Sequence, residues 1–237
     1  MAAYTAPLPS CHVHPSQLAD SRYLDKTQPS GSRWSKAGTS TIPRMYHSSA
    51  VLLPDGSVAV SGSNPNADVV LPDRVPSFPN GNYKYYTEYA VEIFYPDYYA
   101  KPRPKPVGMP TNLTYGGEYF DIKLSKDDLI KTSNIVNATK AVVIRPGFST
   151  HGMNMGQRHV ELRTSFTTHA DGGATLHVAQ LPPNPAILAP GPALFFVVVD
   201  GVPSNASWVT VGDGVIGTQT VREDSVLPNS TIGYDQL

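Results

Sequence analysis

Proline and glycine recur along this sequence too often for long helices to form. The chain has 23 prolines and 19 glycines in 237 residues. Proline alone is about twice as frequent as the usage near 5% that is typical of proteins. Inside a helix proline removes a hydrogen bond and clashes with the preceding turn. The sequence therefore predicts an all-β fold, built from short strands joined by tight turns.

Charge and cysteine content exclude several classes of function. Charged residues make up 16% of the chain and the formal net charge is -1, so neither sign of field builds up to hold a nucleic acid or an anionic membrane. Cys11 is the only cysteine, and no internal disulfide can form. The opening Met-Ala-Ala-Tyr-Thr-Ala-Pro has neither a basic start nor an apolar run. We expect no signal peptide and no membrane-spanning segment in this chain.

The first hundred residues predict one strand-turn-strand unit. A hairpin is expected where two β-rich runs, Ser48–Leu53 and Ser57–Ser61, flank a Pro-Asp-Gly turn. A long loop then leads to a strand over Tyr89–Tyr95, and Arg33–Ser35 is a further candidate strand. This is the size of one propeller blade, whereas a propeller closes with typically 4–8 blades. We therefore expect a blade remnant over 21–102, after an irregular lead-in over 1–20.

A second domain is expected after the proline-spaced linker Lys101–Pro106. Strand candidates follow at regular intervals, with one helical turn between the first two, at Lys126–Lys131. The strand candidates are Glu118–Leu124, Ala141–Ile144, Val160–Phe166, Ala174–Gln180, Ala193–Asp200 and Ser207–Val211. This pattern fits an immunoglobulin-like sandwich over 103–212. The continuous apolar run Leu194–Val199 is typical of a central strand buried on both faces, and 213–237 is expected to be a loose tail.

Few residues are candidates for catalysis or metal binding, because nucleotide-binding, hydrolase and zinc motifs are all absent from the sequence. Tyr46 and His47 precede the first hairpin strand, and they could share a metal only if the backbone bends there. His151 lies in a glycine-flanked loop of the second domain, where a ligand could project outward. Imidazole and phenolate suit copper(II). On spacing alone, however, a structural role for each histidine is the favoured interpretation.

The sequence segments around these residues resemble those of a known family. One segment resembles the final-blade segment of glyoxal oxidases and, more distantly, of galactose oxidase: Arg-Met-Tyr-His-Ser-Ser-Ala-Val-Leu-Leu-Pro-Asp-Gly-Ser-Val-Ala-Val-Ser-Gly-Ser-Asn-Pro-Asn. Val-Glu-Ile-Phe-Tyr-Pro-Asp-Tyr is similar to the outgoing strand of that blade. A third segment resembles the copper-ligand loop of the family's C-terminal domain: Phe-Ser-Thr-His-Gly-Met-Asn-Met-Gly-Gln-Arg. A fourth resembles the end of that domain: Leu-Pro-Pro-Asn-Pro-Ala-Ile-Leu-Ala-Pro-Gly-Pro-Ala-Leu-Phe-Phe-Val-Val-Val. The resemblance covers about 21–212.

The resemblance implies a fungal-type, secreted copper radical oxidase that oxidises an aldehyde or primary alcohol and reduces O2 to hydrogen peroxide. His47 and His151 would be equatorial ligands of one copper ion. Tyr46 would be the axial ligand and the general base that accepts the substrate's hydroxyl proton. The family's radical tyrosine and its cross-linked cysteine lie upstream of the matching region, and neither Cys11 nor Trp34 stands in a corresponding position. Radical turnover by this chain alone is therefore not expected.

Other features carry alternative interpretations. Cys11, His12 and His14 form a possible metal cluster outside the resemblance. Tyr83, Tyr85, Tyr86 and Tyr89 could form a sugar-stacking surface, although a packed loop lid is favoured. Met153 and Met155 are expected to be packing residues rather than copper ligands, and His159, His169 and His177 to be structural or exposed. Sequons at Asn112, Asn137, Asn205 and Asn229 either occur by chance or are glycan acceptors of a secreted protein.

Two alternatives to a partial oxidase chain remain open. The chain could be a binding module for glycans or proteins that uses no metal, or another polypeptide could supply the missing blades and restore the enzyme. An incomplete blade leaves unpaired strand edges and apolar faces. We therefore expect self-association or a partner that covers them.

Overall fold

The computed structural model describes residues 20–25, 27–72, 83–129, 138–151 and 153–231. Across these residues the regular structure is almost entirely strand, with one helical turn, α1 (Lys126–Leu129), and one 3₁₀ turn, η2 (Asp97–Ala100). The all-β prediction is confirmed. No helix in the described part of the chain is long and apolar enough to cross a membrane.

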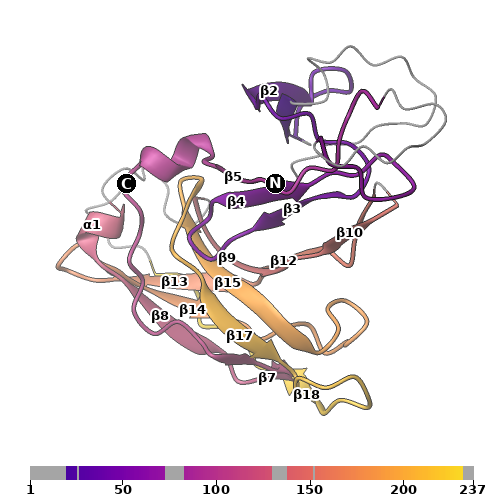
Figure 1. Ribbon diagram of the computed structural model, residues 1–237. Coiled ribbons are helices and arrows are strands. Elements are labelled where there is room, and N and C mark those ends of the chain that lie inside the picture. The colour runs from indigo at the N-terminus through magenta and orange to yellow at the C-terminus, as the bar shows by residue number, and fades with distance from the viewer. Residues whose placement is uncertain (1–19, 26, 73–82, 130–137, 152, 232–237) are drawn as a thin grey trace. The chain divides into compact units, whose positions relative to one another are not determined.

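Contacts along the chain divide it into two units, coloured by residue number in Figure 1. The first unit comprises the described residues of Met1–Leu52, Val58–Pro96 and Gly147–Met155. The second comprises those of Leu53–Ser57, Asp97–Pro146 and Gly156–Leu237. The segment 147–155, which lies within the predicted second domain, is thus grouped with the first unit. The predicted domain boundary near residue 103 stays a prediction.

The first unit is built from three small antiparallel sheets. Their strands are β3 (Ser48–Leu52), β4 (Val58–Gly62) and β5 (Val91–Phe94) in one sheet, β1 (Asp20–Leu24) and β2 (Trp34–Thr39) in another, and β10 (Phe148–Thr150) and β11 (Met153–Met155) in the third. The predicted hairpin is present, because β3 pairs with β4 in the register Ser48 with Gly62. β5 then pairs with β4, as the predicted strand over Tyr89–Tyr95 requires. The sequence did not predict β10 or β11.

The second unit is a sandwich of two main sheets. One has the strand order β12-β9-β15-β17-β6 with β16 paired to β15, the other the order β13-β14-β8, and β18 pairs separately with β7. The strands are β6 (Asn112–Leu113), β7 (Tyr115–Gly117), β8 (Phe120–Leu124), β9 (Thr139–Arg145), β12 (Arg158–Leu162), β13 (Thr164–Thr168), β14 (Ala174–Val178), β15 (Gly191–Val199), β16 (Val202–Pro203), β17 (Ser207–Val211) and β18 (Val221–Asp224).

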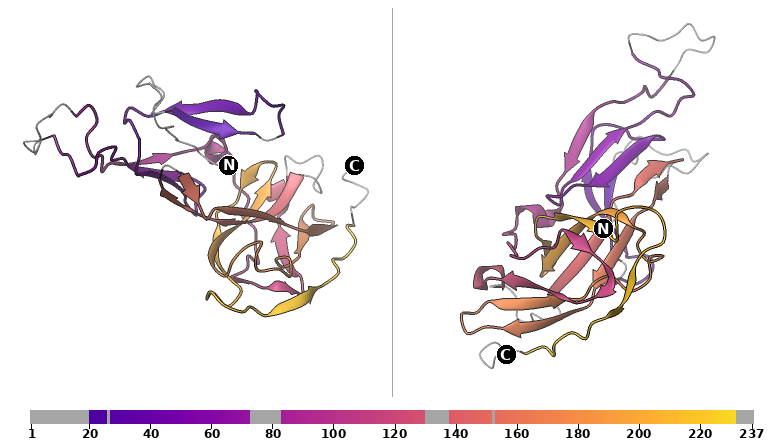
Figure 2. Two further views of the ribbon diagram at one scale, coloured as in Figure 1. Left: turned by 90° about the vertical axis from the view of Figure 1, so that its right-hand side faces the viewer. Right: turned by 90° about the horizontal axis from the view of Figure 1, so that it is seen from below.

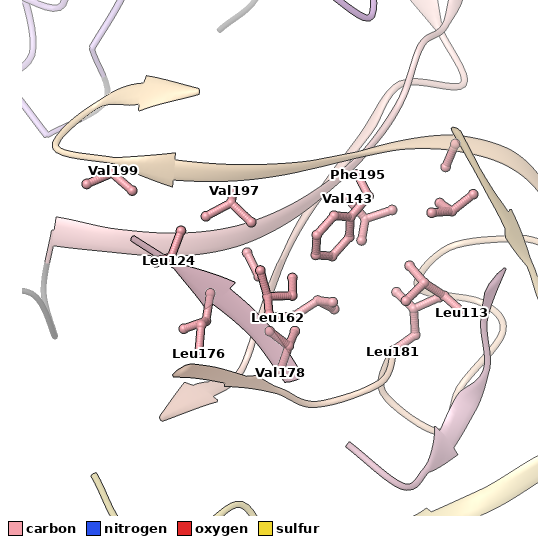
Figure 3. Close-up of a cluster of buried hydrophobic side chains, with 14 of the residues drawn as sticks. Leu113, Leu124, Val143, Leu162, Leu176, Val178, Leu181, Phe195, Val197 and Val199 are labelled. Carbon is pink, nitrogen blue, oxygen red and sulfur yellow. The ribbon is translucent and has the colours of Figure 1, made fainter. Parts of the chain in front are cut away.

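The core of the sandwich lies between its two main sheets (Figure 3). Phe195, Val197 and Val199 of β15 meet Leu176 and Val178 of β14 there, and all five are buried. The prediction of a doubly buried central strand is confirmed, because β15 lies between β9 and β17 and its alternate residues Leu194 and Phe196 are also buried.

The prediction of one strand over Val160–Phe166 was wrong. The chain instead leaves β12 in one sheet and enters β13 in the other, with Arg163 between them. Leu162 and Phe166 both point into the core, but from opposite sheets. An even spacing of apolar residues fits a single strand equally well, so the sequence pattern did not reveal the crossing.

The C-terminal segment is not a loose tail within the described residues. It runs along the outside of the sandwich to the yellow end of the chain in Figure 2. β18 pairs in parallel with β7, and the Thr231 N–H donates to the Phe166 carbonyl oxygen at 2.7 Å. All four residues of β18 are exposed. The strand is held by backbone pairing and by an ion pair between Arg163 and Asp224 at 2.9 Å. Neither contact leaves a hydrophobic alternation in the sequence, which explains why the strand was missed.

Candidate copper site

Tyr46 and His47 lie in a tight turn immediately before β3. The Ser48 N–H donates to the Met45 carbonyl oxygen at 3.1 Å and closes the turn, and His47 has a φ of 65°. Neighbouring residues of a regular strand point to opposite faces. Here the bend brings the two rings together, with centroids 3.9 Å apart and planes at 43°. The backbone bend on which shared ligation depends is therefore present.

His151 lies at the tip of the β10–β11 hairpin. Thr150 pairs with Met153 across this hairpin, and His151 has a φ of 55°. Its Nδ1 lies 2.9 Å from the Thr150 hydroxyl oxygen. If Nδ1 carries the proton and donates it to that oxygen, the lone pair of Nε2 is available for a metal.

The three predicted ligands come together within the first unit. β10 contacts β3, and the rings of Tyr46 and His151 approach edge to face with centroids 6.5 Å apart. Tyr46 is half-buried, while His47 and His151 are exposed. The imidazoles of His47 and His151, from segments far apart in the sequence, therefore both lie near Tyr46, and both can be reached from solvent.

Backbone conformation sets the two histidines apart from other residues. Only four non-glycine residues in the described chain have positive φ, and His47 and His151 are two of them. For an L-residue this left-handed region is uncommon and costs free energy. Such a conformation persists where surrounding contacts impose it, and it often occurs at functional sites.

Hydrogen bonds hold the Tyr46–His47 turn against the end of β4. The Met45 N–H donates to the Ser63 hydroxyl oxygen at 2.9 Å, and the Asn64 N–H donates to the Tyr46 carbonyl oxygen at 2.7 Å. Both contacts are on the backbone of the turn. Its orientation is therefore fixed without use of either side chain that would hold a metal.

Sequence reasoning missed a partly buried ion pair beside this turn. Arg44 is 3% exposed and its guanidinium donates to Glu92 Oε2 on β5 at 2.6 and 3.0 Å. Burial tends to raise the pKa of Glu92, but hydrogen bonds from Ser40 and Arg44 and the positive charge of Arg44 outweigh it, and the pKa lies below its ordinary value. Arg44 belongs to the sequence segment Arg-Met-Tyr-His, and this resemblance to the family was the one sequence signal that could have pointed to it.

The donor set fits copper. Two imidazoles and a phenol supply nitrogen and oxygen ligands of the kind that a tetragonal copper(II) site uses. Among the described residues no three His, Cys, Asp or Glu side chains gather to hold a metal. A metal bound here would therefore depend on Tyr46 as well as on the two histidines.

Comparison with known proteins identifies the family. Residues 15–98 match a family model described as glyoxal oxidase N-terminus. Residues 103–211 match one described as galactose oxidase-like, Early set domain. The chain belongs to the glyoxal oxidase and galactose oxidase-like family. The resemblance stated from the sequence is confirmed.

Relatives of this oxidase family show that the chain is partial. It is 34% identical over 191 residues to the aldehyde oxidase GLOX1 of Arabidopsis thaliana, covering 78% of this chain and 29% of the relative. It is 36% identical over 186 residues to the aldehyde oxidase GLOX of Vitis pseudoreticulata, covering 77% and 32%. A solved fungal alcohol oxidase of the AA5 family, in complex with copper, superposes with a TM-score of 0.52 at 20% identity and covers 81% of this chain and 36% of that one. The chain thus spans about a third of the length of these oxidases.

Three groups of the remaining predicted residues can be taken together. Cys11, His12 and His14 lie outside the described residues, as does Asn137. Tyr83 and Tyr85 are half-buried and Tyr86 and Tyr89 are exposed, so the choice between a lid and a stacking surface stays open. The acceptor asparagines that are described are all exposed: Asn112, Asn205 and Asn229.

Other histidines and methionines can be placed individually. His177 is 8% exposed, and its Nδ1 and Nε2 lie 2.6 Å from Asp121 Oδ1 and 2.9 Å from the Thr167 hydroxyl oxygen. His159 and His169 are exposed, so the prediction of structural or exposed histidines is confirmed. Met153 and Met155 were expected to pack, but they are 51% and 40% exposed. That expectation was wrong for this chain, because the short hairpin that carries them leaves both side chains accessible to solvent.

Proposed function

We propose that this chain carries the histidine-and-tyrosine part of the mononuclear copper site of a secreted oxidase of aldehydes or primary alcohols. The observation that carries the proposal is the meeting of Tyr46, His47 and His151, with the two histidines held in left-handed turns. His47 and His151 are assigned as equatorial ligands and Tyr46 as the axial one. The names of the aldehyde oxidase relatives support the substrate class.

The chain's own residues would bind the metal and move one proton. Bound copper supplies a one-electron acceptor and a Lewis acid. Tyr46, as phenolate, would accept the hydroxyl proton of the substrate, because a general base acts within hydrogen-bond reach of the proton that it takes. Its half-buried position, in ring contact with both imidazoles, suits that task.

The electron balance requires groups from outside this region. Oxidation of an alcohol to an aldehyde, or of an aldehyde hydrate to an acid, releases two electrons and two protons, which O2 takes up as hydrogen peroxide. Copper accepts one electron, so a second redox group is needed. By resemblance that group is a tyrosine cross-linked to a cysteine in blades that precede this region, and Cys11 does not correspond to that cysteine. We therefore propose that turnover requires the missing blades.

Exposed apolar side chains on and beside β5 support a partner or self-association. Tyr89, Val91, Ile93 and Tyr95 are 66%, 64%, 40% and 56% exposed. Val91 and Ile93 are alternate residues of the edge strand β5, and the two tyrosines flank it. We propose that this stripe is covered by the rest of a propeller or by a second copy of the chain. Light scattering tests this proposal, and a stable monomer at high concentration would argue against it.

Copper(II) titration of the metal-free chain, followed by EPR, tests the site directly. We expect one tetragonal signal per chain, lost in His47→Ala and in His151→Ala and kept in His169→Ala, an exposed histidine of the second unit. A signal insensitive to the first two substitutions would contradict the proposed ligands. In that event the metal-free binding module, with its tyrosine-rich loop, becomes the better hypothesis.

Peroxide release then distinguishes an active chain from a partial one. We expect none from this chain alone with an aldehyde substrate. Appearance of peroxide on addition of a polypeptide carrying the missing blades would support complementation. Turnover by the isolated chain would contradict the need for a second redox group.

A further inference from the structure

We infer that Arg44, Glu92 and Gly62 are positioning residues that set the orientation of the Tyr46–His47 ligand turn. This inference rests on the proposed copper site. None of the three would touch copper or substrate. They act through the end of β4 and the two residues that follow it, which contact the turn.

The first link is the ion pair between buried Arg44 and half-buried Glu92. Arg44 uses its Nε and Nη2 on Glu92 Oε2, at 3.0 and 2.6 Å, and its Nη1 on the Gly62 carbonyl oxygen, at 2.8 Å. The Ser40 hydroxyl donates to the other Glu92 oxygen at 2.6 Å. Two guanidinium donors thus share one carboxylate oxygen while Ser40 binds the other, and charge-assisted hydrogen bonds of this kind are stronger than neutral ones. The segment before the turn is therefore fastened both to β5 and to the end of β4.

The second link is the close approach of Gly62 to the turn. A Cβ on Gly62 would lie 2.7 Å from the His47 carbonyl oxygen, and Gly62 has a φ of 74°. Ser63 and Asn64, the next two residues, hold the backbone of Met45 and Tyr46. Three consecutive residues thus contact three consecutive residues of the turn, and Arg44 anchors the first of them.

Polar contacts carry this task because few apolar ones are available. Val70 and Pro96 are the only buried apolar residues of the first unit among those described. The turn therefore has little hydrophobic packing to fix it in place. In metal sites, groups that orient a ligand typically change metal affinity by about 10–100-fold when removed.

Two substitutions test the inference, each with a matched control. Glu92→Gln keeps the shape but removes the charge that holds Arg44, and Glu161→Gln makes the same change in an exposed ion pair of the second unit. Gly62→Ala presses on the His47 carbonyl, whereas Gly38→Ala in the same unit meets nothing closer than 3.7 Å. We expect Glu92→Gln and Gly62→Ala to weaken copper(II) affinity about 10–100-fold and to shift the EPR signal, and both controls to leave them unchanged.

A copper-free measurement separates this inference from the proposed function. Ring-to-ring NOEs between Tyr46 and His47 report the turn directly, and the β15 amide signals confirm that the sandwich remains folded. We expect these NOEs to weaken in Glu92→Gln and Gly62→Ala but not in the controls. Unchanged NOEs and affinity would overturn the positioning role. If the wild-type chain binds no copper, the proposed site fails, and the NOEs alone decide the positioning role.

Discussion

The two units of this chain are stabilised by different interactions. The second unit buries an extensive hydrophobic core, in which Phe195 and Leu176 are fully inaccessible. In the first unit the buried side chains among the described residues are mostly polar, with Arg44, Ser48 and Ser63 beside Val70. Burial of apolar surface is the dominant favourable term in folding. The second unit therefore has the means to be stable alone, and the first depends on directional contacts.

This difference bears on function because all three proposed ligands belong to the first unit. Hydrogen bonds and an ion pair fix orientation well, but each contributes only about 0.5–3 kcal/mol of net stability. A copper site in such a unit is well oriented but marginally stable. That balance is what we expect if the first unit is, as predicted from the sequence, a remnant of a propeller whose neighbouring blades would add apolar burial.

The largest expected effect is in the sandwich core. Phe195→Ala should lower the free energy of unfolding by about 3–5 kcal/mol, because it removes a fully buried aromatic side chain and leaves a cavity. Urea denaturation followed by circular dichroism measures the change. Trp208→Ala, in the same sheet but 57% exposed, should cost far less. Equal losses for the two would mean that the core does not dominate the stability of the second unit.

A smaller effect is expected where β18 joins the sandwich. A Cβ on Gly116 would overlap the Arg222 carbonyl oxygen, whereas one on Gly201 would meet nothing, although both glycines have positive φ. Gly116→Ala should therefore destabilise the protein by roughly 1–3 kcal/mol more than Gly201→Ala. Thermal unfolding of the two variants provides the comparison. A null difference would show that the C-terminal strand adds nothing to the second unit.

Acid should weaken the first unit through Glu92. Its pKa is lowered in the folded chain, so the stability that it contributes is fully present above the unfolded-state pKa and is lost as pH falls through the folded value. We expect the ring NOEs of the Tyr46–His47 turn to fade below about pH 4.5, the ordinary glutamate value, while β15 stays protected from hydrogen exchange. Glu92→Gln should remove this pH dependence. Simultaneous loss of both units in the wild type would break the comparison.

The smallest effect is expected at an exposed ion pair of the second unit. Lys140 Nζ lies 2.9 Å from Glu161 Oε2, and the two side chains are 47% and 49% exposed. Removing Lys140 should change stability by at most about 1 kcal/mol, and less at high salt. Urea midpoints of Lys140→Met at two salt concentrations measure this. A loss as large as that of Phe195→Ala would show that surface charge, rather than the core, stabilises the sandwich.

Sequence by itself determined the local elements and the family. The Pro54-Asp55-Gly56 turn and its flanking strands were predictable because turn chemistry is local, and Leu194–Val199 was predictable because a continuous apolar run marks a buried strand. The sequence segments around Tyr46, His47 and His151 identified the candidate ligands through their resemblance to the family. Spacing could not, since two distant histidines specify nothing.

Only the tertiary structure decided which parts meet. It grouped the His151 hairpin with the Tyr46–His47 turn, carried the chain between sheets at Arg163 and paired the exposed strand β18. It also joined Arg44, in the segment before β3, to Glu92 on β5. These features depend on long-range contacts, backbone pairing and left-handed conformations. None of them leaves a periodic side-chain pattern, which is the signal that a single sequence offers.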